Sequence, residues 1–216
     1  MYHVLGKDLI FPDPDLADEE GLLAIGGDLS IDRLVLAYRS GIFPWYNEGE
    51  PILWFSPDPR LILLPAHLKV SKSLKHLINA GHYTFKINLN FEQVIGNCAL
   101  ITRKDQDGTW ITGEMYHAYN ALHQAGHAHS FEVYNQQDQL VGGLYGIRQG
   151  KVFFGESMFH HESNCSKLAL YYLVQWCKEN SIHFIDAQVP TDHMKSMGAQ
   201  EISREAFLKQ LQKALQ

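Results

Sequence analysis

The character of the sequence changes at Arg60, and this change limits the folds that the chain can adopt. Before Arg60, turn signals are so dense that only 31–40 predicts a helix, with apolar Leu34, Val35 and Tyr38 on one side. The turn signals are Phe11-Pro12-Asp13-Pro14-Asp15, Gly26-Gly27-Asp28, Gly41-Ile42-Phe43-Pro44-Trp45 and Ser56-Pro57-Asp58-Pro59. After Arg60, apolar runs alternate with amphipathic segments, which predicts alternating strands and helices. We therefore expect a small, loop-rich N-terminal domain over residues 1–62 and a larger domain of strands and helices over residues 63–216.

The larger domain is expected to contain an antiparallel meander and a buried helix. Strands are predicted at 61–64, 83–87, 129–134, 140–148, 151–154 and 182–189. Helices are predicted at 70–78, from residue 91, and at 113–124, 166–179, 192–197 and 204–214. The segment 166–179 is apolar on almost all sides, so this helix should be buried.

Composition excludes several classes of protein. No apolar run approaches the roughly 18 residues that a membrane span needs, and the N-terminus lacks a basic flank followed by an apolar stretch. The three cysteines form no CxxC pair, so neither a disulfide framework nor a cysteine-rich zinc site is indicated. We expect a cytoplasmic protein without a membrane partner, and nothing in the sequence argues against a monomer.

Charge is distributed unevenly along the chain. Residues 1–60 hold 11 acidic and 4 basic side chains, whereas residues 61–216 hold 13 and 14. In the helix predicted at 70–78, Lys69, Lys72 and Lys75 lie opposite the apolar positions. Two interpretations stay open: a solvated face of a core-packed helix, or a surface that contacts a polyanion.

Two carboxylates stand in apolar strands. Asp186 lies in Phe184-Ile185-Asp186-Ala187-Gln188-Val189, where strand alternation places Asp186 and Gln188 on one face. Glu156 lies in Phe153-Phe154-Gly155-Glu156-Ser157-Met158, where Gly155 allows a β-bulge. An unpaired carboxylate in such surroundings costs several kcal/mol. Two interpretations of each acid therefore stay open: it pairs with a basic residue or caps a neighbouring helix, or it faces a pocket that accepts a cation beside an apolar group. The nearby aromatic residues are compatible either with the walls of such a pocket or with an ordinary hydrophobic core.

Motifs of other chemistries are missing. The histidine pairs His127/His129 and His160/His161 offer no clean set of four ligands, so we expect no metal. Gly142-Gly143-Leu144-Tyr145-Gly146 matches neither a P-loop nor GxGxxG, and GxSxG does not occur. We expect no cofactor, neither ATP nor NAD.

Six stretches taken together resemble the leucyl/phenylalanyl-tRNA protein transferase family. They are Gly21 to Leu29 (GLLAIGGDL), Ala37 to Trp45 (AYRSGIFPW), Trp54 to Arg60 (WFSPDPR), Gly142 to Gly146 (GGLYG), Phe154 to Phe159 (FGESMF) and Ile185 to Gln188 (IDAQ). They follow the family's order from about residue 11 to about residue 207, so the resemblance covers nearly the whole chain.

The resemblance implies an α+β fold, with a small N-terminal domain before an N-acetyltransferase-like (GNAT) mixed sheet flanked by helices. It also implies an acyltransferase that moves Leu or Phe, and Met less well, from aminoacyl-tRNA to the N-terminal Arg or Lys of a protein, marking that protein for degradation. Such a reaction is independent of the ribosome. Because the ester of an aminoacyl-tRNA is already activated, its aminolysis requires neither ATP nor an enzyme nucleophile.

The resemblance also suggests roles for individual residues. Asp186 would accept a hydrogen bond or proton from the attacking amine, Gln188 would orient Asp186 or the amine, and Glu156 would hold the basic acceptor side chain or the amine. The cavity for the transferred side chain would be lined by Phe153, Met158, Leu170 and Ile185. Trp54 and Trp110 would stack on the terminal adenosine of the tRNA. The tRNA backbone would lie on Lys69, Lys72 and Lys75.

Two other functions remain compatible with the residues. One is an acetyl-CoA-dependent N-acetyltransferase, although the segment 160–165 before the buried helix has no glycine to cradle a pyrophosphate. The other is a non-catalytic module that binds basic N-termini through Glu156 and Asp186. An internal Arg or Lys sealed against Asp186 would contradict its proposed role at the reaction centre.

Overall fold

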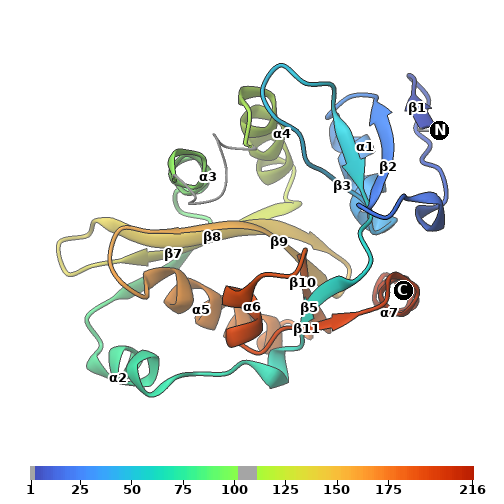
Figure 1. The fold of residues 1–216 in the computed structure, drawn as a ribbon. Helices are drawn as coiled ribbons and strands as arrows, with labels where there is room; N and C mark the ends of the chain where they lie inside the picture. Colours follow the sequence, from blue (N-terminus) through green and yellow to red (C-terminus); the bar gives the residue numbers. More distant parts are fainter. Residues whose placement is uncertain (1–2, 102–110) are drawn as a thin grey trace.

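Two β-sheets organise the molecule, seen here in a computed structural model that describes residues 3–101 and 111–216 (Figure 1). The smaller sheet has the order β1-β2-β4-β3, and only β1 and β2 pair in parallel. Its strands are β1 (His3–Leu5), β2 (Leu22–Gly26), β3 (Phe43–Pro44) and β4 (Leu53–Phe55), with the 3-10 turn Pro14–Leu16 between β1 and β2 and α1 (Ile31–Arg39) between β2 and β3.

The larger sheet has the order β11-β5-β10-β9-β8-β7-β6. Its strands are β5 (Arg60–Leu63), β6 (Thr84–Ile87), β7 (Ala128–Tyr134), β8 (Leu140–Gln149), β9 (Val152–His160), β10 (Phe184–Gln188) and β11 (Gln200–Ile202). Strands β7, β8 and β9 form the predicted antiparallel meander. Only β9 and β10 pair in parallel, at the centre of the sheet.

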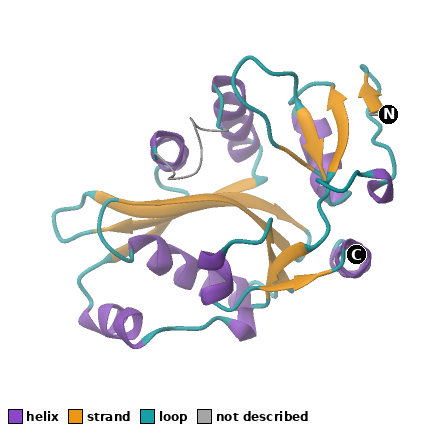
Figure 2. Ribbon diagram, in the orientation of Figure 1, coloured by secondary structure: helices purple, strands orange, loops and turns teal. Residues whose placement is uncertain are grey.

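Helices cover both faces of the larger sheet (Figure 2). One face carries α3 (Phe91–Leu100) and α4 (Gly113–Gln124), and the opposite face carries α5 (Cys165–Glu179). The remaining helical segments are the 3-10 turn Pro65–His67, α2 (Lys72–Ala80), α6 (Asp192–Ser196) and α7 (Arg204–Ala214). The predicted burial of the helix over 166–179 is confirmed, since eight residues of α5 are buried.

Side-chain caps explain where several helices begin. Ser30, Thr112 and Ser203 each accept a hydrogen bond from the backbone N–H three residues further on, at the starts of α1, α4 and α7. Ser71 caps α2 in the same way, so this helix begins at Lys72 and not at Val70 as the periodicity predicts. Lys69 consequently lies before the helix, with its backbone N–H donating to the Met197 carbonyl at 2.9 Å.

The α+β fold prediction is confirmed, with a small N-terminal sheet followed by a mixed sheet that helices flank. The predicted domain boundary between residues 62 and 63 falls inside β5 and stays a prediction. One hydrophobic core joins the two parts, because Tyr38 of α1, Tyr119 of α4 and Phe154 of β9 are all buried in it. Within the part of the chain that the structure describes, no helix combines the length and the apolar character that crossing a membrane requires.

Candidate active site

A cavity of about 360 Å³ opens where the two parallel strands separate. Strands β9 and β10 pair from Val152/Phe184 to Phe154/Asp186, and beyond this point each strand continues without pairing to the other. The cavity has a largely apolar wall formed by Leu144, Met158, Leu170, Leu173, Ile185 and Met194. The small sheet contributes Phe43, Pro44 and Trp45, so both parts of the molecule form the cavity.

A β-bulge brings Glu156 to the cavity. In the pairing of β8 with β9, Tyr145 faces Ser157 and Gly146 faces Gly155, which leaves Glu156 as the extra residue. The sheet can close around the bulge because position 146 is glycine: a Cβ there would lie 2.1 Å from the Phe154 carbonyl oxygen. The bulge predicted beside Gly155 is therefore present.

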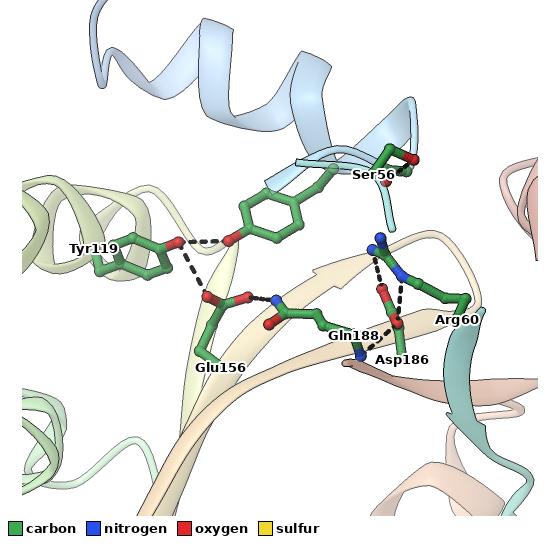
Figure 3. Close-up of polar contacts among 8 residues, drawn as sticks. Ser56, Arg60, Tyr119, Glu156, Asp186 and Gln188 are labelled. Atoms are coloured by element: carbon green, nitrogen blue, oxygen red, sulfur yellow. Dashed lines mark hydrogen bonds and ion pairs between the residues drawn. The ribbon is translucent and has the colours of Figure 1, made fainter. Parts of the chain in front are cut away.

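A second irregularity places Gln188 opposite Glu156. The pairing of β10 with β5 shifts between Asp186 and Gln188, and Gln188 has a φ of 62°, a left-handed conformation that is costly for this residue type. The Asp186 carboxylate supports this backbone, since its Oδ1 accepts the Gln188 N–H at 2.9 Å. The Gln188 side chain then donates from Nε2 to Glu156 Oε1 at 2.8 Å (Figure 3).

Asp186 does not face the cavity, which corrects the prediction that it meets the attacking amine. Arg60 donates from Nε to Asp186 Oδ1 at 2.9 Å and from Nη2 to Oδ2 at 2.7 Å, and both residues are fully buried (Figure 3). The guanidinium also lies 4.9 Å from the Phe43 ring centroid and 4.4 Å from that of Phe207. Both carboxylate oxygens thus accept hydrogen bonds from Arg60, and Asp186 is not among the residues that line the cavity.

Glu156, unlike Asp186, lies on the cavity wall. Its Oε2 accepts the Tyr119 hydroxyl at 3.1 Å, and Tyr119 in turn is hydrogen-bonded to the Tyr38 hydroxyl. Burial raises the pKa of Glu156 from 4.5 to about 7, against the opposing effect of the nearby Tyr38 and Tyr119 hydroxyl groups. A carboxylate poised near neutral pH on a cavity wall is typical of an acid–base group.

Three of the four predicted side-chain-pocket residues lie on the cavity wall: Met158, Leu170 and Ile185. Phe153 does not. Its ring is fully buried and packs edge-to-face on Phe131 and Trp176, with ring centroids 5.7 and 6.1 Å away. Phe153 lies where β9 and β10 are still paired, in the buried cluster that packs against α5, so it belongs to the core.

Trp54 cannot stack on a base in this conformation, which corrects a second prediction. Its side chain is fully buried, with Nε1 donating to the Gly26 carbonyl at 2.8 Å and Phe11 packed against the ring at a centroid distance of 4.8 Å. Trp45, which the prediction missed, lies on the cavity wall and is partly exposed. The sequence signal was its place directly after Pro44, in a segment rich in turn residues. Trp110 lies outside the described residues.

The three lysines are exposed and lie away from the cavity wall. Lys72 and Lys75 belong to α2, whose single buried residue is Leu74. None of the ion pairs found among the described residues involves Lys69, Lys72 or Lys75. The same described residues contain no group of three or more His, Cys, Asp or Glu side chains that could hold a metal ion.

Comparison with known proteins identifies the family. Two family models match the chain: "Leucyl/phenylalanyl-tRNA protein transferase" over residues 62–212, and the N-terminal domain of the same family over residues 27–58. A leucyl/phenylalanyl-tRNA–protein transferase of Maridesulfovibrio salexigens is 55% identical over 97% of this chain and 88% of its own length. The protein of the same name from Flavobacterium johnsoniae is 52% identical over 96% of this chain and 97% of its own length.

Solved structures align less closely. L-PGS from Bacillus licheniformis aligns with a TM-score of 0.42 and 14% identity, over 79% of this chain and 54% of its own. A GNAT-family acetyltransferase from Staphylococcus aureus aligns with a TM-score of 0.35 and 18% identity, over 46% of this chain and 69% of its own. The family follows from the sequence matches alone: this chain belongs to the leucyl/phenylalanyl-tRNA protein transferase family and is an aminoacyltransferase.

Proposed function

We propose that this aminoacyltransferase moves Leu or Phe, and Met less well, from aminoacyl-tRNA to the N-terminal Arg or Lys of an acceptor protein. The observation that supports this proposal is a single cavity with an apolar wall and the Glu156–Gln188 pair on the same surface. The apolar wall suits a branched or aromatic side chain, and the carboxylate suits a cationic acceptor. The added Leu or Phe would then act as a degradation signal on the acceptor.

The apolar wall predicts loose selectivity for the transferred amino acid. Met158, Leu170 and Ile185 offer no hydrogen-bonding group to a side chain in the cavity, so discrimination depends on fit. Fit alone distinguishes substrates by roughly 1 to 3 kcal/mol per methylene. Leu, Phe and Met are therefore all accepted, whereas a charged side chain would leave its charge without a partner.

Glu156 and Gln188 hold the acceptor amine. Glu156 is the single carboxylate among the described residues that line the cavity, and the Gln188 amide lies beside it at 2.8 Å. The α-amine of a peptide has a pKa of about 7.7 to 8.0, so part of it is neutral at pH 7 and ready to attack the ester. Orienting the two reactants can contribute about 7 to 11 kcal/mol to the rate, and neither ATP nor a covalent enzyme intermediate is needed.

Asp186 acts on this site indirectly. Its bond to the Gln188 N–H fixes the left-handed backbone that directs the Gln188 side chain at Glu156, while Arg60 neutralises its charge. We assign Asp186 as a positioning residue for Gln188.

The tRNA is proposed to contact two parts of the protein surface. Trp45, at the cavity wall, replaces Trp54 as the residue that stacks on the terminal adenosine, a contact worth about 1 to 3 kcal/mol per base. The exposed lysines Lys69, Lys72 and Lys75 supply contacts to the phosphate backbone. Because these contacts are few, specificity rests on the acyl group and the terminal adenosine more than on the tRNA sequence.

The protein is proposed to work as a monomer in the cytoplasm, where charged tRNA occurs. The cysteines Cys98, Cys165 and Cys177 are buried and are not joined in disulfides, which suits a reducing compartment.

One assay tests the proposed function directly. Purified protein is incubated with charged Leu-tRNA or Phe-tRNA and a peptide that begins with Arg, and mass spectrometry looks for one added residue. A matched peptide that begins with Glu is the acceptor control, and acetyl-CoA in place of the tRNA is the donor control. Extension of the Arg peptide alone supports the proposal; acetylation would indicate an acetyltransferase, and retention of the peptide without extension would indicate a binding module.

A further inference from the structure

Two buried tyrosines connect the N-terminal part of the molecule with Glu156. Tyr38 comes from α1 and Tyr119 from α4, and both side chains are completely inaccessible to solvent. Their hydroxyl groups are hydrogen-bonded to each other, and the Tyr119 hydroxyl lies 3.1 Å from Glu156 Oε2 (Figure 3). The hydroxyl groups are not needed to fill the core, because a phenylalanine at either position would place the same ring there.

The direction of the hydrogen bonds follows from the number of hydrogens. A phenol has one hydrogen to donate. Tyr119 donates it to the Glu156 carboxylate, so its oxygen accepts the hydrogen of Tyr38. Burial raises the pKa of both tyrosines well above 10, and the charge of Glu156 acts in the same direction, so both remain donors at any pH at which the enzyme works. The chain of donors thus ends on the carboxylate.

Several of the described groups around Glu156 affect how easily it ionises. Tyr38 and Tyr119 stabilise its ionised form, and Gln188 of β10 does the same through Nε2. The negative charge of Asp186, also on β10, opposes ionisation, although Arg60 pairs with that charge. Tyr145 of β8 packs edge-to-face on Tyr119, at a centroid distance of 5.7 Å. These hydrogen-bonding groups therefore offset part of the cost of burying the carboxylate, and burial still raises its pKa.

We infer that Glu156 is the proton acceptor of the transfer reaction, and that Tyr38 and Tyr119 are positioning residues whose hydroxyl groups stabilise its ionised form. This inference rests on the proposed function. The amine nitrogen attacks the ester carbonyl carbon and forms the new C–N bond, and its proton passes to Glu156. The C–O bond to the ribose then breaks, the same proton moves to the leaving ribose oxygen, and the carboxylate is restored. No oxidant, reductant or other reactant is consumed.

Single hydroxyl deletions test this assignment. Tyr119→Phe and Tyr38→Phe each keep the aromatic ring and remove one hydroxyl from the chain of hydrogen bonds that ends on the Glu156 carboxylate. The ionised form of Glu156 then becomes less stable, so its pKa rises. The acid limb of the pH profile of kcat/KM for an Arg-initiated peptide should move to higher pH by about one unit or more in each variant. Because the same peptide is used throughout, titration of its own amine contributes equally to every profile.

Tyr83→Phe is the matched control. The Tyr83 hydroxyl also donates to a carboxylate, Glu162 Oε2, at 2.7 Å, but neither residue lies on the cavity wall. The acid limb of the pH profile of Tyr83→Phe should coincide with that of the wild type. A second measurement does not depend on activity: the pH dependence of thermal unfolding, compared between the wild type and Glu156→Gln, reports the titration of Glu156, and the same comparison in the Tyr119→Phe background should show that titration at higher pH.

Each outcome decides the question. Shifted limbs in both tyrosine variants and an unshifted limb in Tyr83→Phe support the inference. Variants that lose activity equally at every pH, with the limb in place, would show that the hydroxyls serve only the packing and would overturn it, as would failure of both variants to fold. A wild-type protein that extends no peptide would refute the proposed function instead, while the unfolding measurement still reports whether the tyrosines control Glu156.

Discussion

The ion pair between Arg60 and Asp186 offers a decisive test of how Asp186 contributes. Asp186→Asn removes the negative charge but keeps a carbonyl oxygen that can accept the Gln188 N–H, now bonded at 2.9 Å. Arg60 would then be a fully buried cation without a counterion. Breaking a buried pair in this way costs about 3 to 5 kcal/mol. In a chain of this length each kcal/mol lowers Tm by about 2 to 4 °C, so the expected decrease is about 6 to 20 °C.

A double-mutant cycle separates folding from chemistry. Arg60→Gln alone leaves Asp186 as a buried anion and should destabilise the protein by a similar amount. The double variant Arg60→Gln/Asp186→Asn contains two neutral amides that can hydrogen-bond to each other, so we expect it to recover about half or more of the lost stability. Unfolding would be followed in urea, and the transfer rate would be measured per folded molecule at a temperature where all variants are folded.

The two possible roles of Asp186, positioning Gln188 and taking part in the chemistry, predict different transfer activities. If Asp186 positions Gln188, the double variant regains transfer together with stability, although it has no carboxylate at position 186. If Asp186→Asn unfolded like the wild type while transfer vanished, or if the double variant were stable and completely inactive, the carboxylate would act in the chemistry. Either result would refute the positioning role derived from the buried pair.

Three further predictions concern the cavity and its surroundings. Glu156→Gln should abolish transfer yet raise the free energy of unfolding at pH 8 by about 1 to 3 kcal/mol. The folded protein holds the Glu156 proton up to a pKa of about 7, so the wild type loses stability as pH rises from about 4.5 to about 7. Calorimetry across this pH range should show that the variant lacks this loss. Trp45→Ala should raise KM for charged tRNA with little change in Tm, whereas Trp54→Ala should cost about 3 to 5 kcal/mol of stability because its ring is core; equal KM effects would contradict the assignment of Trp45. Lys72→Glu with Lys75→Glu should raise KM for tRNA and flatten its dependence on salt, and an unchanged KM would place the tRNA backbone elsewhere.

Local sequence patterns predicted most of the secondary structure because helix caps and apolar periodicity act within a few residues along the chain. The helix over 113–124 was predicted with its observed bounds, since Thr112 provides a cap and the apolar periodicity starts directly after it. The start of α2 was misplaced by two residues, because Val70 continues the apolar spacing although Ser71 is the cap. The cap determines where the backbone can begin to turn, and the apolar residue before it is 38% exposed.

The site was predicted in part, and the errors have a physical cause. Glu156, Gln188, Met158, Leu170 and Ile185 were all expected at one cavity, and they do line one. The partner of Asp186 could not be found from local spacing, since Arg60 lies 126 residues earlier in the chain. Strand pairing between β5 and β10 brings the two together, and no pattern in a single sequence specifies that pairing.

The two carboxylates also show why burial alone does not identify a catalytic acid. Asp186 and Glu156 both stand beside aromatic residues in central strands, so the local sequence pattern does not distinguish them. The structure pairs Asp186 with the full positive charge of Arg60, so neither charge is left without a partner in the core. It compensates Glu156 with neutral donors from Tyr119 and Gln188, which lower the cost of ionisation without removing it. Of these two acids, Glu156 lies on the cavity wall and has a pKa raised to about 7, and this is why the proton transfer is proposed for Glu156 and not for Asp186.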